Sequence, residues 1–272
     1  SFVSRGLGDV YKRQLQSWYW FDWANQAFAL TVITVVVPTL LSNMFNLANG
    51  GSADYAGMTF TGDSFYAVVL GISSVFVAIV SPVLGAIADR MPIKKKILKV
   101  YTVVGILFTG LMGLAPYMDD SSSYKFLAIC LIMGNIGFAG GHAIYSAFLP
   151  YLGDRRLMDH ISSWGYAYGF LGGCILLTVH LAVGLRFGFE DPDVQCFVFV
   201  TSALWWLGFS VPMFRNTPEP EIPNPTEYPN VFEAVKDGLR EIKSTFLEIR
   251  RYKVLSLFMC GYLLFYDGVN AI

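Results

Sequence analysis

Long blocks of apolar residues constrain the fold of this chain more than any other feature. Six of them cover residues 17–45, 63–88, 96–118, 124–151, 161–187 and 194–214, and a seventh begins near residue 253. Blocks of about 20 residues are long enough for an α-helix to cross a bilayer. Only 14% of the residues are charged, against roughly 25% in a soluble domain. The sequence therefore predicts an all-α, multi-pass integral membrane protein.

The basic residues between these blocks predict the orientation of the helices. Fourteen of them fall on one side of the predicted membrane, against Lys125 and Arg186 on the other. Loops rich in Lys and Arg stay in the cytoplasm, so the N-terminus is expected there. The plasma or inner membrane and the vacuolar membrane both stay open. The fourteen residues are Arg90, Lys94, Lys95, Lys96, Lys99, Arg155, Arg156, Arg215, Lys236, Arg240, Lys243, Arg250, Arg251 and Lys253.

The chain divides into four expected parts. Residues 9–14 read like the translation of a sequencing-library adaptor, so we expect residues 1–14 to be an assembly artefact. Residues 15–215 are expected to form an N-terminal six-helix bundle, and 216–251 a cytoplasmic loop. Residues 252–272 are then the truncated seventh helix of an expected twelve, because the chain stops inside an apolar run.

The loop after the sixth helix contains an amphipathic segment. It opens with Pro218, Pro220, Pro223 and Pro225, which predict extended backbone. Six apolar residues then recur at steps of three and four, which predicts a helix lying on the cytoplasmic membrane surface. A plain linker is the favoured interpretation, and a regulatory or partner-binding surface is the alternative. The apolar residues are Phe232, Val235, Leu239, Ile242, Phe246 and Ile249.

Two carboxylates inside apolar blocks are the main candidates for a binding site. Asp22 and Asn25 in the first block, and Asp267 and Asn270 in the seventh, share the pattern aromatic-Asp-x-x-Asn. The spacing places each Asp and Asn on one helix face. Equivalent positions in helices one and seven are typical of a duplicated six-plus-six transporter. Both pairs are therefore expected to face a central cavity and to bind a proton or a substrate ammonium group, with helix capping or helix–helix bonding as the alternative.

Other polar and small residues in the apolar blocks are weaker candidates. His142 follows two glycines and could line the cavity, although a hydrogen-bonded packing histidine is the favoured interpretation. His180 is predicted to be structural. Gly165, Gly169 and Gly173 recur at steps of four, which predicts close helix packing in lipid.

Several functional classes find no support in the sequence. The motifs GxxxxGK[ST], HExxH and GxSxG are absent, so we expect no ATP coupling, no catalytic residues and no enzyme activity. The His and Cys residues lack metal-ligand spacing, and neither a metal nor a cofactor is expected. A net charge of −1 gives no reason to expect nucleic-acid binding.

The segment between the second and third blocks resembles a known signature. Gly85, the pair Asp89–Arg90 and the basic cluster starting at Lys94 resemble the cytoplasmic loop motif of the major facilitator superfamily. The resemblance implies a major-facilitator-type bundle, in which Gly85, Asp89, Arg90 and Lys94 are gating residues rather than substrate ligands.

A closer resemblance covers residues 17 to 272. The start of the first block, the run from Tyr145 to Pro150, the glycines from Gly165 to Gly173 and the segment Tyr266–Asn270 are similar to the vacuole-effluxer branch of that superfamily. That branch, once labelled as unknown major facilitators, includes autophagy-related vacuolar amino-acid effluxers. It implies a secondary, proton-coupled transporter of a small solute, with amino-acid efflux as the leading substrate. A different polar solute or drug, or a non-transporting sensor or scaffold, are the alternatives.

Overall fold

The computed structural model describes residues 2–55, 57–153, 155–222, 228, 231–249 and 252–270. Within these residues the regular elements are helices apart from one small hairpin between α2 and α3, in which β1 (Ala53–Tyr55) pairs antiparallel with β2 (Met58–Phe60). The helices are α1 (Phe2–Ala27), η1 (Phe28–Val36), α2 (Val37–Asn49), α3 (Gly62–Ala88), α4 (Lys94–Met112), η2 (Ala115–Tyr117), α5 (Asp120–Ser146), η3 (Leu149–Tyr151), η4 (Arg155–Leu157), α6 (Met158–Phe187), α7 (Pro192–Asn216), α8 (Val231–Ile249) and α9 (Lys253–Asn270).

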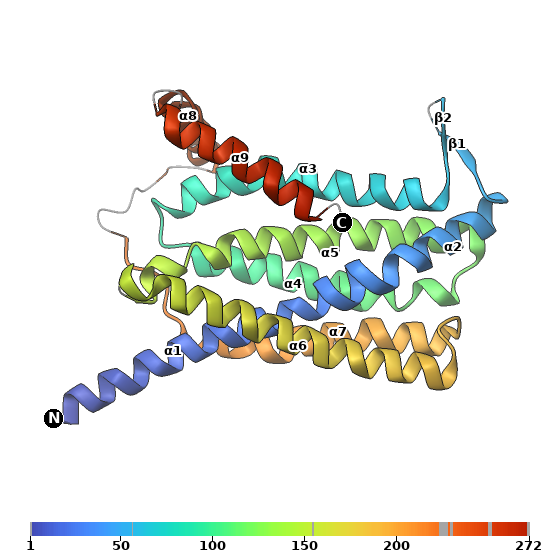
Figure 1. The fold of residues 1–272 in the computed structure, drawn as a ribbon, viewed down its shortest axis with the longest axis horizontal. Helices are drawn as coiled ribbons and strands as arrows, with labels where there is room; N and C mark the ends of the chain where they lie inside the picture. Colours follow the sequence, from blue (N-terminus) through green and yellow to red (C-terminus); the bar gives the residue numbers. More distant parts are fainter. Residues whose placement is uncertain are drawn as a thin grey trace.

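Six helical segments of the described chain are long and apolar enough to cross a membrane. They begin at Gly8, Gly62, Lys94, Asp120, Met158 and Pro192, and the first is the continuous rod α1–η1–α2. Their long axes run roughly side by side in one bundle (Figure 1). The all-α fold class is confirmed. The division into an artefact, a bundle, a loop and a truncated helix stays a prediction.

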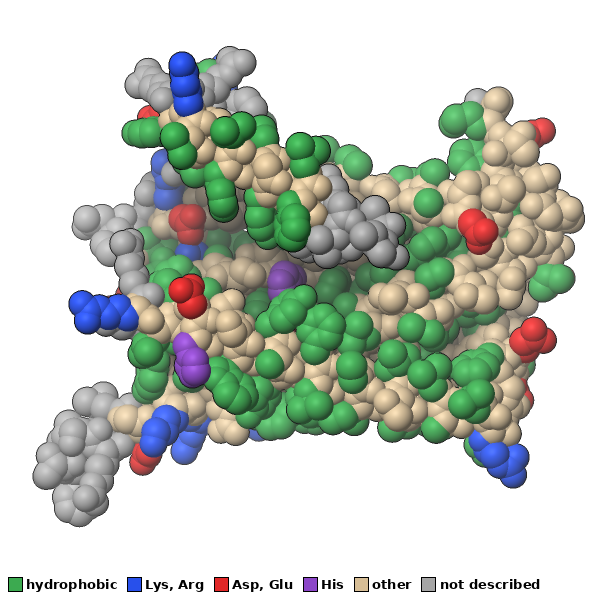
Figure 2. Space-filling view, viewed as in Figure 1, with side chains coloured by type: hydrophobic (Ala, Val, Ile, Leu, Met, Phe, Trp, Pro, Cys, Tyr) green, Lys and Arg blue, Asp and Glu red, His purple; other side chains and the backbone are tan. Residues whose placement is uncertain are grey.

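Charge is distributed unequally between the two ends of the bundle. Figure 2 shows Lys and Arg side chains gathered mostly at the end where α8 lies, while Asp and Glu predominate on this face at the opposite end. Charged groups stay outside the hydrocarbon layer because their desolvation is unfavourable. This arrangement agrees with the expected membrane placement, and the cytoplasmic location of the basic end stays a prediction.

The first rod is the centre of the packing. The α1 segment packs against α6 and α7, α2 packs against α3 and α5, and α4 packs against α5 and α7. Phe28, at the start of η1, is fully buried, and its ring lies 5.5 Å from those of Phe138 on α5 and Trp206 on α7. Aromatic contacts of this kind join three spanning segments at one level of the bundle.

The middle of the first rod is a π-helix, and its cause can be traced to one proline. Pro38 has no N–H and its ring opposes a regular α-helical turn. The Val37 N–H donates to the carbonyl of Val32, five residues back. In the same pattern the carbonyl of Ile33 would accept from residue 38, but Pro38 has no N–H to donate. The hydroxyl of Tyr66 on α3 donates to this Ile33 carbonyl at 2.9 Å. An unpaired carbonyl in lipid costs several kcal/mol, so Tyr66 offsets the effect of Pro38.

The helix α8 lies across the basic end of α3. Ala234 and Gly238 are buried, and a Cβ atom on Gly238 would lie 3.2 Å from the Val83 carbonyl of α3. On the other flank of α8, Phe232 and Leu239 are exposed. A helix is present where the sequence predicts one, and its position on a membrane surface stays a prediction.

We predict that Tyr66→Phe lowers the free energy of unfolding of the full-length protein by about 1–3 kcal/mol, because it leaves the Ile33 carbonyl without a donor. Reversible unfolding in bicelles would measure the change. The control is Tyr166→Phe, at an exposed tyrosine on α6, which should change stability by less than about 0.5 kcal/mol. Equal effects of the two substitutions would contradict the assigned role of Tyr66.

Candidate functional site

Small residues bring α6 into close contact with α1. A Cβ atom at Gly165 would lie 2.5 Å from the Trp18 ring, and one at Gly173 would lie 3.0 Å from the Gln26 carbonyl. Neither position can hold a larger side chain without a shift of the helices. The predicted packing role of these glycines is confirmed, and this contact shapes the surroundings of Asp22.

Asp22 lies within this helix contact. A Cβ atom at Gly169 would stand 3.0 Å from Asp22 Oδ2 and 2.8 Å from Gln26 Cγ, so Gly169 leaves the space that the carboxylate occupies. Asp22 is only 3% exposed and Asn25 only 2%. Asp22 is therefore buried against α6, and the expectation that it faces a central cavity stays a prediction. It also lies inside α1, away from its ends, which rules out a role as a helix cap.

The polar atoms of this pair are incompletely bonded. Among the described residues, Asp22 Oδ1 and Asn25 Oδ1 are buried and have no hydrogen-bond donor. A buried carboxylate without a donor is strongly destabilising when ionised. The site can relieve this by taking up a proton or by binding a ligand that donates hydrogen bonds.

His142 is connected to the segment around Asp22 through one intervening residue, Tyr145. Its ring is 5.8 Å from that of Tyr145, and the Tyr145 hydroxyl donates to the Trp18 carbonyl at 3.1 Å. Trp18 is one helical turn before Asp22, so Tyr145 connects α5 to the segment that carries the carboxylate. In the described part of the chain His142 Nδ1 is buried without a partner.

The second histidine has a structural position. His180 Nε2 lies 2.8 Å from the Thr201 hydroxyl and joins α6 to α7, which confirms the prediction. The pair Asp267 and Asn270 falls near the end of α9, but their side chains lie outside the described residues. The expected convergence of the two Asp-x-x-Asn pairs therefore stays a prediction.

The signature loop between α3 and α4 forms a compact set of ionic contacts. Lys94 Nζ lies 2.7 Å from Asp89 Oδ1 and 3.3 Å from the Tyr151 hydroxyl, to which it donates. The Lys94 side chain is only 3% exposed. Arg90 Nη1 donates to Asp237 Oδ2 on α8 at 2.6 Å. A Cβ atom added at Gly85 would have no neighbouring heavy atom within 4 Å, so close packing does not explain the glycine at this position.

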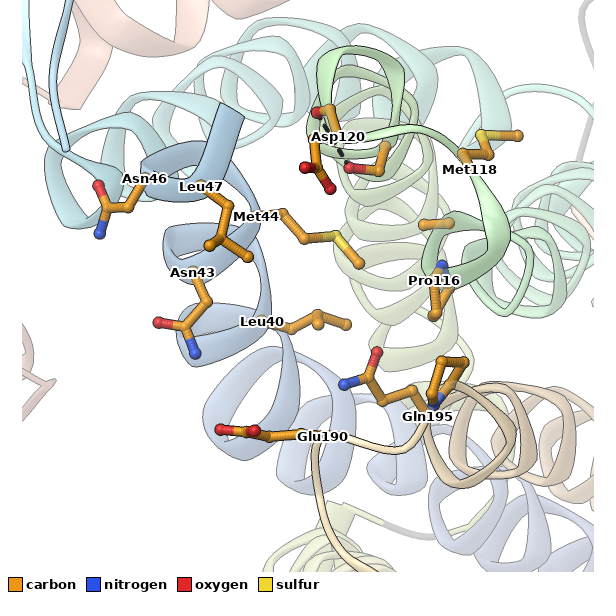
Figure 3. A pocket seen from close by; sticks show the side chains of 13 residues that line it. Leu40, Asn43, Met44, Asn46, Leu47, Pro116, Met118, Asp120, Glu190 and Gln195 are labelled. Carbon is orange, nitrogen blue, oxygen red and sulfur yellow. Dashed lines mark hydrogen bonds between the residues drawn. The ribbon is translucent and has the colours of Figure 1, made fainter. Parts of the chain in front are cut away.

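A large cavity of the described residues is lined by other residues than those around Asp22. It has a volume of about 670 Å³ and lies at the acidic end of the bundle, between α2 and the starts of α5 and α7. Figure 3 shows Leu40 and Met44 pointing into it from α2, with the Gln195 amide and Pro116 on its other side. A smaller cavity of about 370 Å³ shares Leu40 and Gln195 and extends to His180. None of the motifs in the sequence includes these lining residues, so sequence reasoning missed this cavity.

Comparison with known proteins identifies the family. Residues 11–272 match the family model described as "Vacuole effluxer Atg22 like". The chain belongs to the Atg22-like vacuole effluxer family. The match covers almost the whole chain and includes the α1–α6 contact, the signature loop and α8, so the family resemblance drawn from the motifs is confirmed.

Two relatives of this Atg22-like chain agree with the family assignment. The uncharacterized MFS-type transporter YxiO of Bacillus subtilis is 28% identical over 278 residues, which cover 96% of this chain and 59% of YxiO. Autophagy-related protein 22 of Kluyveromyces lactis is 22% identical over 303 residues, which cover 98% of this chain and 60% of that protein. The chain thus spans about three fifths of the length of the curated relatives it matches.

For this Atg22-like bundle we predict that Gly169→Ala lowers the free energy of unfolding by about 1–3 kcal/mol, because the added methyl group overpacks the α1–α6 contact. Gly208→Ala on α7 is the matched control, since nothing lies within 4 Å of its added Cβ. That substitution should leave stability unchanged or raise it by up to about 1 kcal/mol, the helix propensity difference. Effects of the same sign and size at both positions would contradict the packing assigned to Gly169.

Proposed function

We propose that the full-length protein is a secondary active transporter that moves a small solute by alternating access. Membership of the effluxer family and similarity to an MFS-type transporter support this class. The six candidate spans form one bundle, and in such transporters the binding site lies near mid-membrane, where two bundles meet. The chain would then supply one bundle and the start of the other.

The buried Asp22 carboxylate is the observation that carries the proposal. In the described part of the chain it forms no ion pair, and its Oδ1 has no donor. An ionisable group in a spanning helix is expensive to keep and commonly marks an ion or substrate pathway. We assign Asp22 the role of proton acceptor or ammonium ligand, with Asn25 as a neutral hydrogen-bonding partner.

Two further elements complete the proposed site. His142 would lie beside the carboxylate region through its contact with Tyr145, and Asp267 with Asn270 would supply the equivalent pair from the other bundle. For Asp22 to reach a solute, α6 must move away from α1 at some point in the cycle. The contact at Gly169 is therefore expected to loosen during transport.

Amino acids, exported with proton coupling, are the leading substrate. An amino acid carries an ammonium group that a carboxylate can hold and a carboxylate that amide and imidazole donors can bind. The family description agrees with an effluxer. Another polar solute or a drug is the second candidate, because the cavity of about 670 Å³ has both apolar and polar lining residues, and its described lining holds Asp120 and Glu190 but no Lys or Arg.

The signature loop is assigned to gating. Lys94, at the start of α4, is almost fully buried between Asp89 and Tyr151. Its two contacts connect the end of α3 to η3, which follows α5, at the basic face. Breaking a paired charge in such a place leaves its partner unbalanced. Asp89, Arg90 and Lys94 are therefore proposed to hold the basic face in one arrangement while the bundles are closed there.

We predict that Asp22→Asn abolishes uptake driven by a pH gradient in proteoliposomes of the full-length protein, because the amide cannot take up a proton. Counterflow of a labelled amino-acid mixture needs no imposed gradient, so it measures binding and exchange separately from coupling. Wild type should show saturable counterflow. Asp54→Asn, the same substitution at an exposed carboxylate on β1, is the matched control and should retain both activities.

The outcomes separate the hypotheses. Retained counterflow with lost pH-driven uptake assigns Asp22 to the proton, and loss of both assigns it to the substrate. Normal pH-driven uptake in Asp22→Asn would contradict the role of Asp22. No counterflow of any amino acid by folded wild type would remove this substrate class and favour another solute or a non-transporting sensor or scaffold.

A further inference from the structure

The segment that follows the sixth span contacts the signature loop at two separate places. Near its start, both carboxylate oxygens of Glu219 accept a hydrogen bond from the Lys95 backbone N–H, at 3.0 and 3.2 Å. Further along, Asp237 on α8 accepts from Arg90 at 2.6 Å. Each contact joins residues more than 120 positions apart in the sequence.

Glu219 supplies a cap that α4 does not make for itself. The residue at the N-cap position of α4 is Ile93, which forms no side-chain cap. A helix start exposes unpaired N–H groups and a partial positive charge, which a carboxylate stabilises. The Lys95 ammonium also donates to the Thr217 carbonyl at the end of α7, at 2.6 Å. The start of α4 is thereby fastened to the end of α7.

Asp237 fastens the other side of the loop. Its Oδ2 accepts from Arg90 and also from the Tyr228 hydroxyl, at 3.0 Å. Behind it, Ala234 is buried and Gly238 faces the Val83 carbonyl, so small residues let α8 approach α3 closely enough for the ion pair to form. Packing and charge therefore select the same face of α8.

We propose that Asp237 is a positioning residue of the gate: through Arg90 it holds the signature loop against the bundle, and the loop must be released from α8 before the basic face rearranges. The gating part rests on the transport function proposed above, whereas the hold on the loop does not. In this proposal α8 moves together with the first bundle and controls the mobility of the signature loop.

The geometry makes release of this contact feasible within a transport cycle. The Arg90 and Asp237 side chains are 38% and 34% exposed, so water can solvate both when they separate. By contrast, the Lys94 side chain beside them is almost fully buried. Asp89 is 65% exposed, but its separation from Lys94 would leave a buried ammonium group without its counter-charge. Arg90–Asp237 is therefore the contact assigned to break in the cycle.

Hydrogen exchange of the full-length protein in nanodiscs tests the hold on the loop. Asp237→Asn should raise amide exchange about two- to tenfold both in α8 and in residues 89–95, the range expected for a half-exposed ion pair with a further hydrogen bond. Glu248→Gln is the matched control, because it removes the same charge from an exposed position of the same helix and should leave both segments unchanged. Faster exchange in α8 alone, or in neither segment, would overturn the proposal.

Charge reversal tests whether the pair itself is responsible. Arg90→Asp and Asp237→Arg should each raise exchange in residues 89–95, and the double variant should recover protection relative to both single variants. Failure of the double variant to recover any protection would contradict a direct pairing.

Transport kinetics test the gating part. If release of the loop precedes rearrangement, Asp237→Asn should raise the maximal counterflow rate about two- to tenfold at unchanged KM. If Asp237→Asn raises exchange in residues 89–95 but leaves the maximal counterflow rate unchanged or lowers it, Asp237 has a structural role only. That result would overturn its role in the gate. Absence of counterflow in wild type would contradict the transport function while the exchange results still decide whether Asp237 holds the loop.

Discussion

Backbone and side-chain polar groups that enter a bilayer must find their hydrogen bonds inside the protein, and the bundle is arranged around this requirement. Where Pro38 removes a donor from the first rod, the helix widens into a π-helix and Tyr66 reaches across to the Ile33 carbonyl. Asn135 on α5 donates to the Ser73 hydroxyl on α3 at 2.8 Å in the same way. These bonds fix which faces of neighbouring helices meet.

Eleven buried side-chain nitrogen and oxygen atoms of the described residues lack a hydrogen-bond partner, and Asp22 Oδ1 is the only carboxylate oxygen among them. The described residues around it are arranged to make room, since Gly169 leaves space for the carboxylate, but they supply no donor to its Oδ1. Natural sequences keep such a conflict between local stability and environment mainly at functional positions. The close contact of α1 with α6 thus explains both the stability of the bundle and the burial of the group proposed to bind the proton.

Much of the fold could be predicted because its signals are local. Apolar length identified the six spans, steps of four identified the glycine face of α6, and the stripe from Phe232 onward identified α8. The signature loop was predicted as a charged unit, and the structure pairs Asp89 with Lys94 there.

The remaining features depend on contacts between distant parts of the chain. Asp237 and Arg90 are 147 residues apart, and nothing near either residue indicates the other. The contact of Asp22 with Gly169 could not be predicted either, because periodicity gives the face of a helix but not the neighbour that covers it. The π-helix follows from Pro38 only once Tyr66 is known to lie beside Ile33.

Asp22 is proposed to change its protonation state within the membrane. Infrared difference spectroscopy of the full-length protein in liposomes, recorded between acidic and neutral pH, measures this directly through the carbonyl stretch of a protonated carboxyl group. We expect a band that grows on acidification, shifts on substitution of solvent by deuterium oxide and is missing in Asp22→Asn. A spectrum that is identical in wild type and Asp22→Asn would contradict the assignment of Asp22 as the site of proton binding.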